Sequence, residues 1–120
     1  MLTTYLLCLS FRLPSSGNTY LSSFNVPIVG SQSVQMDILN NSYAKITLNG
    51  FIKSCGLVEF TGMDEKGAIS FIVHDPLLSI TKKYRWSITS PKFDEDNDRV
   101  HINLGIRPLF WSKQLDLERI

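Results

Sequence analysis

Hydrophobic and polar residues alternate with a period of two along most of this chain. Between residues 99 and 104, for example, Val100, Ile102 and Leu104 alternate with polar side chains. The same alternation runs through residues 5–11, 19–26, 33–38, 43–48, 57–61, 68–74 and 84–89. This pattern is typical of a β-strand with one face toward a core and the other toward water. The sequence therefore predicts about eight strands, and one more if the C-terminal segment also pairs.

Segments rich in turn-forming residues separate these strands. They are residues 14–18, 40–42, 62–67 and 91–98, the last of which is an acidic loop. The clearest predicted hairpin joins 57–61 to 68–74. Short strands at roughly ten-residue spacing predict an all-β fold, either an antiparallel sandwich or a flattened barrel. We expect a single domain over residues 1–120, with at most one short C-terminal helix.

Three segments have two interpretations each. Residues 49–50 (Asn-Gly) are either a type I′ hairpin turn or a bulge in one long strand, because the apolar pattern continues at Phe51. Residues 77–83 fit either a helical turn or a crossing connection. Residues 112–120 fit either a short helix or a last strand with alternating leucines.

Composition narrows the class of protein. The 120 residues carry a net charge of +1 from 12 basic and 11 acidic side chains, and 43% of the residues are apolar. This apolar share can form a core, which excludes an intrinsically disordered chain. The nearly balanced charge excludes a strongly basic nucleic-acid-binding arm. We therefore expect no nucleic-acid partner.

Signals for the cellular compartment are few. The apolar start of the chain lacks a basic segment and a small-residue cleavage site, so it does not fit a secretory signal. No run approaches the roughly 18 apolar residues of a membrane-spanning helix. We expect Cys8 and Cys55 to be buried thiols, although one bridge between them fits an oxidising compartment. An intracellular protein without a membrane span is the default expectation, and secretion stays open.

Charge is almost absent from the first third of the chain. Arg12 is the only charged residue up to Met36, and Ser or Thr fills ten of those positions. Edge strands are usually protected from pairing with other chains by Lys or other charges. The strands of this segment are therefore either an edge or face that pairs with another subunit, or central strands whose hydroxyls make ordinary cross-strand hydrogen bonds.

Candidate catalytic residues are few. His74, Asp75 and His101 would form a minimal acid–base or metal-binding group if their strands were neighbours. The sequence has no nucleophile elbow, glycine-rich phosphate loop or Cys/His metal motif. Residues 94–98 begin like a calcium loop but lack its later glycine and glutamate. We therefore expect no enzyme activity, no metal and no cofactor.

A cationic face is a second candidate. Arg85, Arg99 and His101 fall at outward positions of two predicted strands. Cations arranged in this way can hold a carboxylate or a phosphate. The neighbouring acidic loop opposes a polyanion such as a nucleic acid.

These observations favour a non-enzymatic interaction or assembly module that acts through an edge strand or through face packing. The expected partner is a protein or a second copy of the chain. Aromatic side chains dominate binding hot spots, and the candidate interface residues are Tyr5, Tyr20, Phe24, Phe110 and Trp111. The apolar cluster at 109–111 has a second interpretation, as a cap over one open end of the core. Two alternatives stay open: a small lipocalin-like barrel that carries an apolar ligand, and an enzyme with a His/Asp site.

Overall fold

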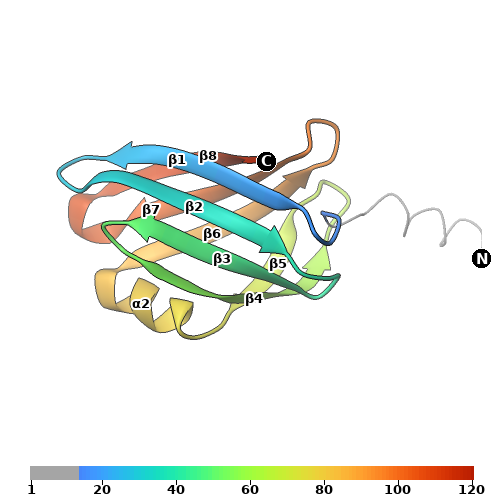
Figure 1. Ribbon diagram of the computed structural model, residues 1–120, viewed down its shortest axis with the longest axis horizontal. Coiled ribbons are helices and arrows are strands. Elements are labelled where there is room, and N and C mark those ends of the chain that lie inside the picture. Colours follow the sequence, from blue (N-terminus) through green and yellow to red (C-terminus); the bar gives the residue numbers. More distant parts are fainter. Residues whose placement is uncertain (1–13) are drawn as a thin grey trace, which may run out of the picture.

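The computed structural model describes residues 14–120, which form one antiparallel sheet that curls into a nearly closed barrel (Figure 1). The strands are β1 (Thr19–Val26), β2 (Gly30–Ile38), β3 (Tyr43–Gly50), β4 (Ser54–Met63), β5 (Ile69–Val73), β6 (Trp86–Asp94), β7 (Arg99–Ile106) and β8 (Trp111–Arg119). A short helix, α2 (Leu77–Tyr84), connects β5 to β6, and a 3-10 turn, η1 (Arg107–Leu109), precedes β8. The predicted all-β class is confirmed, in its barrel form.

The strand order is β5-β4-β3-β2-β1-β8-β7-β6, so strands adjacent in the chain are adjacent in the sheet except β5 and β6, which are its two edges, and β1 meets β8. Because each strand reverses direction, alternate connections share one end of the barrel. Residues 27–29, 51–53, 74–85 and 107–110 build one end, called the helix end. Residues 14–18, 39–42, 64–68 and 95–98 build the opposite end. The helix end is on the left of Figure 1, where α2 lies.

Inward-facing side chains of the strands form the core. The inward positions expected from the alternation are confirmed, for example at Val100, Ile102 and Leu104, which are 0% exposed. Burying a side chain of this kind stabilises the fold by roughly 1.5–3 kcal/mol. The rings of Tyr20 in β1 and Phe93 in β6 meet edge to face inside the barrel, with their centroids 6.3 Å apart. Strands that are not neighbours in the sheet therefore contact each other through the interior.

The barrel closes between β5 and β6 only near the opposite end. Ala68 and Lys92 form an isolated bridge there, and the Phe93 amide donates a hydrogen bond to the Gly67 carbonyl at 2.9 Å. Gly67 has a φ of +86°, and a Cβ at this position would lie 2.5 Å from the Phe93 carbonyl oxygen. Glycine allows both the left-handed backbone and the close approach of the β4–β5 turn to β6.

Toward the helix end, α2 packs against β4 and β6. Leu77 is fully buried, and a Cβ on Gly56 of β4 would lie 2.5 Å from the Leu77 Cβ, so the glycine lets the helix approach the sheet. The helix ends at Arg85, whose left-handed φ of 57° redirects the chain into β6. Of the two interpretations of residues 77–83, the helical one is therefore correct.

The structure also decides the other ambiguous segments. Strand β3 ends at Gly50 and the chain turns at 51–53, so both interpretations of residues 49–50 are wrong. Asn49 and Gly50 pair with β2 inside β3 and are not the hairpin turn, and no single strand continues past them. The C-terminal segment is strand β8 and not a helix. The long loop predicted at 91–98 is wrong, because β6 continues to Asp94 through an irregularity between Thr89 and Lys92.

The described strands of the charge-poor first third of the chain, β1 and β2, lie inside the sheet order, and only part of β1 has an unpaired side. Strand β2 pairs with β1 and β3 along almost its whole length, which agrees with the central-strand interpretation. Strand β1 pairs with β8 only at Tyr20 and Leu21, so its β8 side has no ladder partner beyond them among the described residues. The strand predicted at 5–11, which includes Cys8, lies outside residues 14–120; Cys55 is half-buried.

Gly67→Ala should destabilise the barrel more than Gly17→Ala. Both glycines have nearly the same φ, +86° and +85°, so both substitutions carry a left-handed backbone strain of about 1–2 kcal/mol. Only the Cβ at residue 67 collides with a backbone atom, since no atom lies within 4 Å at residue 17. We expect Gly67→Ala to cost at least about 1 kcal/mol more in urea unfolding. Equal losses would show that closure does not depend on this contact.

Leu104→Ala should lower the free energy of unfolding by about 2–5 kcal/mol, because Leu104 is fully enclosed in the core. Asn103→Ala is the matched control on the outer face of the same strand, and should change stability by less than about 0.5 kcal/mol. The measurement is again urea unfolding. A loss well below 1 kcal/mol at Leu104 would instead indicate a pre-existing cavity, as the ligand-carrier alternative requires.

Candidate functional site

The three candidate catalytic residues do not come together. His74 lies at the helix end with its Nε2 3.1 Å from Glu59 Oε1. His101 lies near the opposite end, with Nδ1 2.5 Å from Asp116 Oδ1 and Nε2 3.7 Å from Asp94 Oδ2. Asp75 is engaged locally by the amide and hydroxyl of Ser79, which lower the pKa of its carboxyl. The expected His/Asp group is therefore not assembled.

The expected cationic face is also divided. Arg99 is paired with Glu118 at 3.1 Å, and His101 is held between two carboxylates, both near the opposite end. Arg85 lies at the helix end, next to the far end of β7, where its carbonyl accepts a hydrogen bond from the Arg107 amide. The length of β7 thus separates Arg85 from the other two. Within residues 14–120, no group of three or more His, Cys, Asp or Glu side chains is arranged to hold a metal ion.

The candidate interface residues differ in their position and in their exposure to solvent. Tyr5 lies outside the described residues. Tyr20 and Phe24 point into the barrel and are 0% and 7% exposed, so as surface anchors they are a wrong expectation. Trp111 is half-buried and stacks on Phe24, with ring centroids 6.0 Å apart. Phe110 is 96% exposed and is the one candidate fully available to a partner.

Tyr20 instead fixes the opposite end of the barrel from inside. Its hydroxyl donates a hydrogen bond to Asp98 Oδ1 at 2.7 Å, and the other oxygen of that carboxylate lies 2.8 Å from Arg119 Nε. Burial, and then the adjacent Asp98 carboxylate, raise the pKa of the Tyr20 phenol to about 12. The phenol therefore stays protonated and keeps β1 tied to the β6–β7 turn.

Tyr20→Phe should remove a pH-dependent part of the stability. A phenol whose pKa is raised from 10.0 to about 12 stabilises the fold fully below pH 10, and this contribution is lost as the pH rises through 12. Wild type should therefore lose stability between pH 10 and 12 more steeply than the variant in urea unfolding. Near pH 7 the variant should lose about 1.5 kcal/mol. Parallel pH profiles would contradict this role of the phenol.

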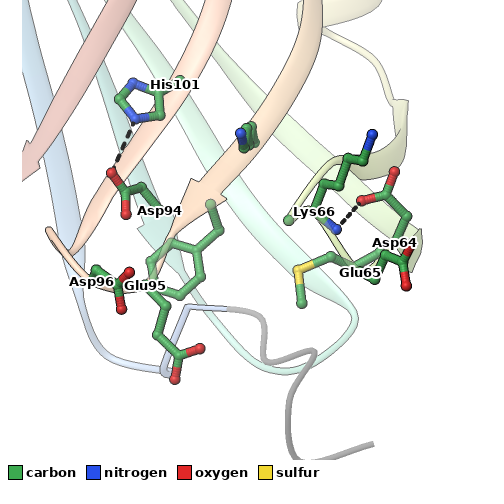
Figure 2. A pocket seen from close by; sticks show the side chains of 11 residues that line it. Asp64, Glu65, Lys66, Asp94, Glu95, Asp96 and His101 are labelled. Atoms are coloured by element: carbon green, nitrogen blue, oxygen red, sulfur yellow. Dashed lines mark hydrogen bonds and ion pairs between the residues drawn. The ribbon is translucent and has the colours of Figure 1, made fainter. Parts of the chain in front are cut away.

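A groove of about 360 Å³ lies at the opposite end, between the β4–β5 turn and the end of β6 (Figure 2). Its polar lining residues are Asp64, Glu65, Lys66, Lys92, Asp94, Glu95, Asp96 and His101, and its apolar ones include Met63 and Phe93. Figure 2 shows Glu65 and Lys66 on one side of the groove and Asp94, Glu95 and Asp96 on the other. The groove therefore has a small apolar part and a largely acidic rim.

Two of these carboxylates hold the turns in place. Asp64 Oδ1 accepts hydrogen bonds from the amides of Lys66 and Ala68. Asp94 accepts from the Asn97 side chain at 2.8 Å, which lowers the pKa of its carboxyl. Residues 94–98 are thus a tight turn and not a helix-flanked calcium loop. Glu65, Glu95 and Asp96 are exposed and form no ion pair with residues of the described chain.

The helix end has the opposite character. Four large apolar side chains are exposed on its connections: Ile28 (96%), Phe51 (63%), Tyr84 (38%) and Phe110 (96%). Phe51 and Tyr84 meet edge to face with centroids 6.3 Å apart. Phe110 borders an open groove of about 830 Å³ lined also by Lys82, Arg85 and Arg107. These loops form an exposed surface that is both apolar and cationic.

Sequence reasoning found Phe110 but missed Ile28 and Phe51. Each is an apolar residue inside a turn, after Pro27 and after Gly50 respectively, where a buried role is hard to reconcile with the chain reversal. An apolar residue inside a chain reversal was therefore the sequence signal that could have identified Ile28 and Phe51 as exposed. The grouping of the three residues followed only from knowing which connections share an end.

Comparisons with protein-family models, with curated proteins and with solved structures find no match. The fold alone therefore defines the class of protein, which is an all-β up-and-down barrel. Its strands β5 and β6 are joined by backbone contacts near the opposite end, and α2 packs against β4 and β6 toward the helix end. Among residues 14–120, no helix has the length and apolar character needed to cross a bilayer.

Proposed function

We propose that this protein is a non-enzymatic interaction module that binds a protein partner through the helix end of its barrel. The observation that carries the proposal is the exposure of Ile28 and Phe110, each 96% accessible, at the tips of two connections that topology brings to one end. Exposed apolar surface is unfavourable in water and is a common feature of contact sites.

The backbone at these positions supports the same conclusion. Ile28 and Phe110 have φ values of 73° and 48°, in the left-handed region where residues other than Gly and Asn are disfavoured. Arg85, exposed on the same end, has a φ of 57°. A left-handed non-glycine residue costs about 1–3 kcal/mol and is frequent at functional sites. At the helix end, the residues in this unfavourable conformation are Ile28, Phe110 and Arg85, whose side chains are exposed to solvent.

The residue types suit protein recognition. Aromatic residues and Arg are enriched in interfaces and at their hot spots, and the rims of interfaces are polar. Phe110 with Arg85 and Arg107 fits the central type, while Lys82 and Lys83 border them. The contact mode is face packing, which was one of the two modes expected from the sequence.

The ligand-carrier alternative has less support. The argument for it from the sequence is that the 7 Phe, 4 Tyr and 2 Trp could line a ligand cavity as readily as fill a core. The interior aromatic rings of Tyr20 and Phe93 contact each other, and Phe24 stacks on Trp111, so these rings contribute to packing. The helix-end surface favours the interaction module.

Phe110→Ser should weaken partner capture at the helix end, and Ile72→Ser should not. Ile72 is 50% exposed on the barrel wall, where it pairs with Glu59 of β4, and it lies outside the helix-end connections; it is the matched loss of an exposed apolar side chain. A photoreactive residue at position 28 crosslinks whatever partner contacts the helix end. Mass spectrometry then measures the mass and yield of the crosslinked product, both for the purified protein and for the protein in cell extract. We expect one product of discrete mass, reduced about tenfold or more by Phe110→Ser.

Two results would contradict the proposal. One is the absence of any discrete product in either sample. The other is an equal yield in the Phe110→Ser and Ile72→Ser proteins, because the product would then not depend on the helix-end surface. Circular dichroism of both variants checks that the barrel is folded.

A further inference from the structure

The two ends of the barrel carry opposite charge. The connections of the helix end contain five cations and one acid: Lys53, Lys82, Lys83, Arg85 and Arg107, with Asp75. The connections of the opposite end contain five acids and one cation: Asp64, Glu65, Glu95, Asp96 and Asp98, with Lys66. The net charge of +1 therefore conceals a strong polarity along the barrel.

Only some of the charges on the barrel wall form ion pairs within the molecule, since Asp37, Lys45, Lys92 and Lys113 have none among the described residues. Arg99 pairs with Glu118 at 3.1 Å and Arg119 pairs with Asp98 at 2.8 Å. None of the five helix-end cations has such a partner in residues 14–120. Asp98 is paired in this way, so four of the five opposite-end acids have no ion pair among the described residues. Unpaired cations therefore predominate at the helix end and unpaired acids at the opposite end.

We propose that the helix end of one copy docks against the opposite end of a second copy, so that the chain assembles head to tail. This inference rests on the proposed function and names its partner. Charge complementarity supports this arrangement, because the cationic helix end and the acidic opposite end belong to the same molecule. A head-to-head contact would instead place five cations against five cations.

The groove of Figure 2 is the receiving site. Met63 and Phe93 supply its apolar part, and Glu65, Glu95 and Asp96 lie around it. Phe110 is the exposed apolar group that enters, and Arg85 and Arg107 beside it meet the carboxylates. Charged hydrogen bonds of Arg to carboxylates set the orientation, and the aromatic contact adds the hydrophobic term.

Such a contact joins two different surfaces. It therefore propagates from copy to copy, and the product is a ring if the rotation closes or an open chain if it does not. Surfaces made of loop tips are small, so we expect weak association of the class with interfaces below about 1,200 Å². Ionic pairing between exposed groups also makes the association weaker in high salt.

The test is a pair of charge-reversed proteins. The first carries Lys83→Glu and Arg107→Glu at the helix end, and the second carries Glu65→Lys and Glu95→Lys at the opposite end. All four side chains are exposed and none forms an ion pair within residues 14–120, so both proteins should fold. Sedimentation velocity over a concentration series measures association, and circular dichroism checks folding.

The expected result has three parts. Wild type forms species larger than a dimer, whose association constant falls in 0.5 M salt. Each charge-reversed protein alone associates at least about tenfold more weakly, a change of roughly 1.4 kcal/mol. An equimolar mixture of the two restores association but stops at the dimer, because each protein retains one competent end and these ends fit each other.

Other outcomes overturn the proposal. A wild-type protein that stays monomeric throughout the series excludes self-assembly. Loss of association in the helix-end variant only, with the other variant unchanged, indicates a head-to-head contact. Binding of the monomer to vesicles of anionic lipid, lost in the helix-end variant only, assigns that surface to a membrane.

These results also separate the two proposals. If wild type is monomeric but position 28 still captures a discrete partner from extract, head-to-tail assembly fails and the interaction module survives. If neither occurs, both fail.

Discussion

The hydrogen bond from the Phe93 amide to the Gly67 carbonyl is the contact on which both ends of the barrel depend. It holds the β4–β5 turn against β6, so the sheet closes at the opposite end and the two sides of the acidic groove stand together. Toward the helix end the same pair of strands no longer bonds, and α2 packs there against β4 and β6. Without this closure, the facing edges of β5 and β6 would be unpaired along their whole length, and an unpaired edge is a site for unwanted pairing between chains.

The up-and-down strand order also explains why charged residues that are far apart in the sequence lie together at one end of the barrel. In an up-and-down barrel, connections alternate between the two ends, so residues far apart in the chain collect on one surface. Lys53, Arg85 and Arg107 come from three separate connections and share the helix end. Glu65 and Glu95 share the opposite end in the same way. Part of the charge on the wall between them forms internal ion pairs, whereas unmatched charge of one sign predominates at each end, with exposed apolar groups at the helix end as well.

Much of the fold was predictable because alternation is a local signal. The inward faces of β2, β3 and β7 followed directly from residue parity, since successive side chains of a strand point to opposite sides. The course of residues 91–98 was not predictable, because an internal proline and acidic composition indicate a loop, whereas pairing with β7 extends β6 to Asp94. Of the helix-end site, the sequence predicted Phe110 as an interface residue and Arg85 as a candidate cation, but not that they lie together. Tyr20 and Phe24 were assigned to the surface although their own alternation placed them inside.

The sequence by itself determined that the chain is all-β and which side chains of most strands form the core, and it named Phe110 as a candidate interface residue. These properties depend on neighbours in the chain and on the two-residue period of a strand. Only the tertiary structure decided that the sheet closes as a barrel, that His74 and His101 lie apart, and that Ile28, Phe51 and Phe110 lie at one end with the cations. Those properties depend on which strands pair across long separations, and that pairing is set by the whole packed sheet rather than by any one segment.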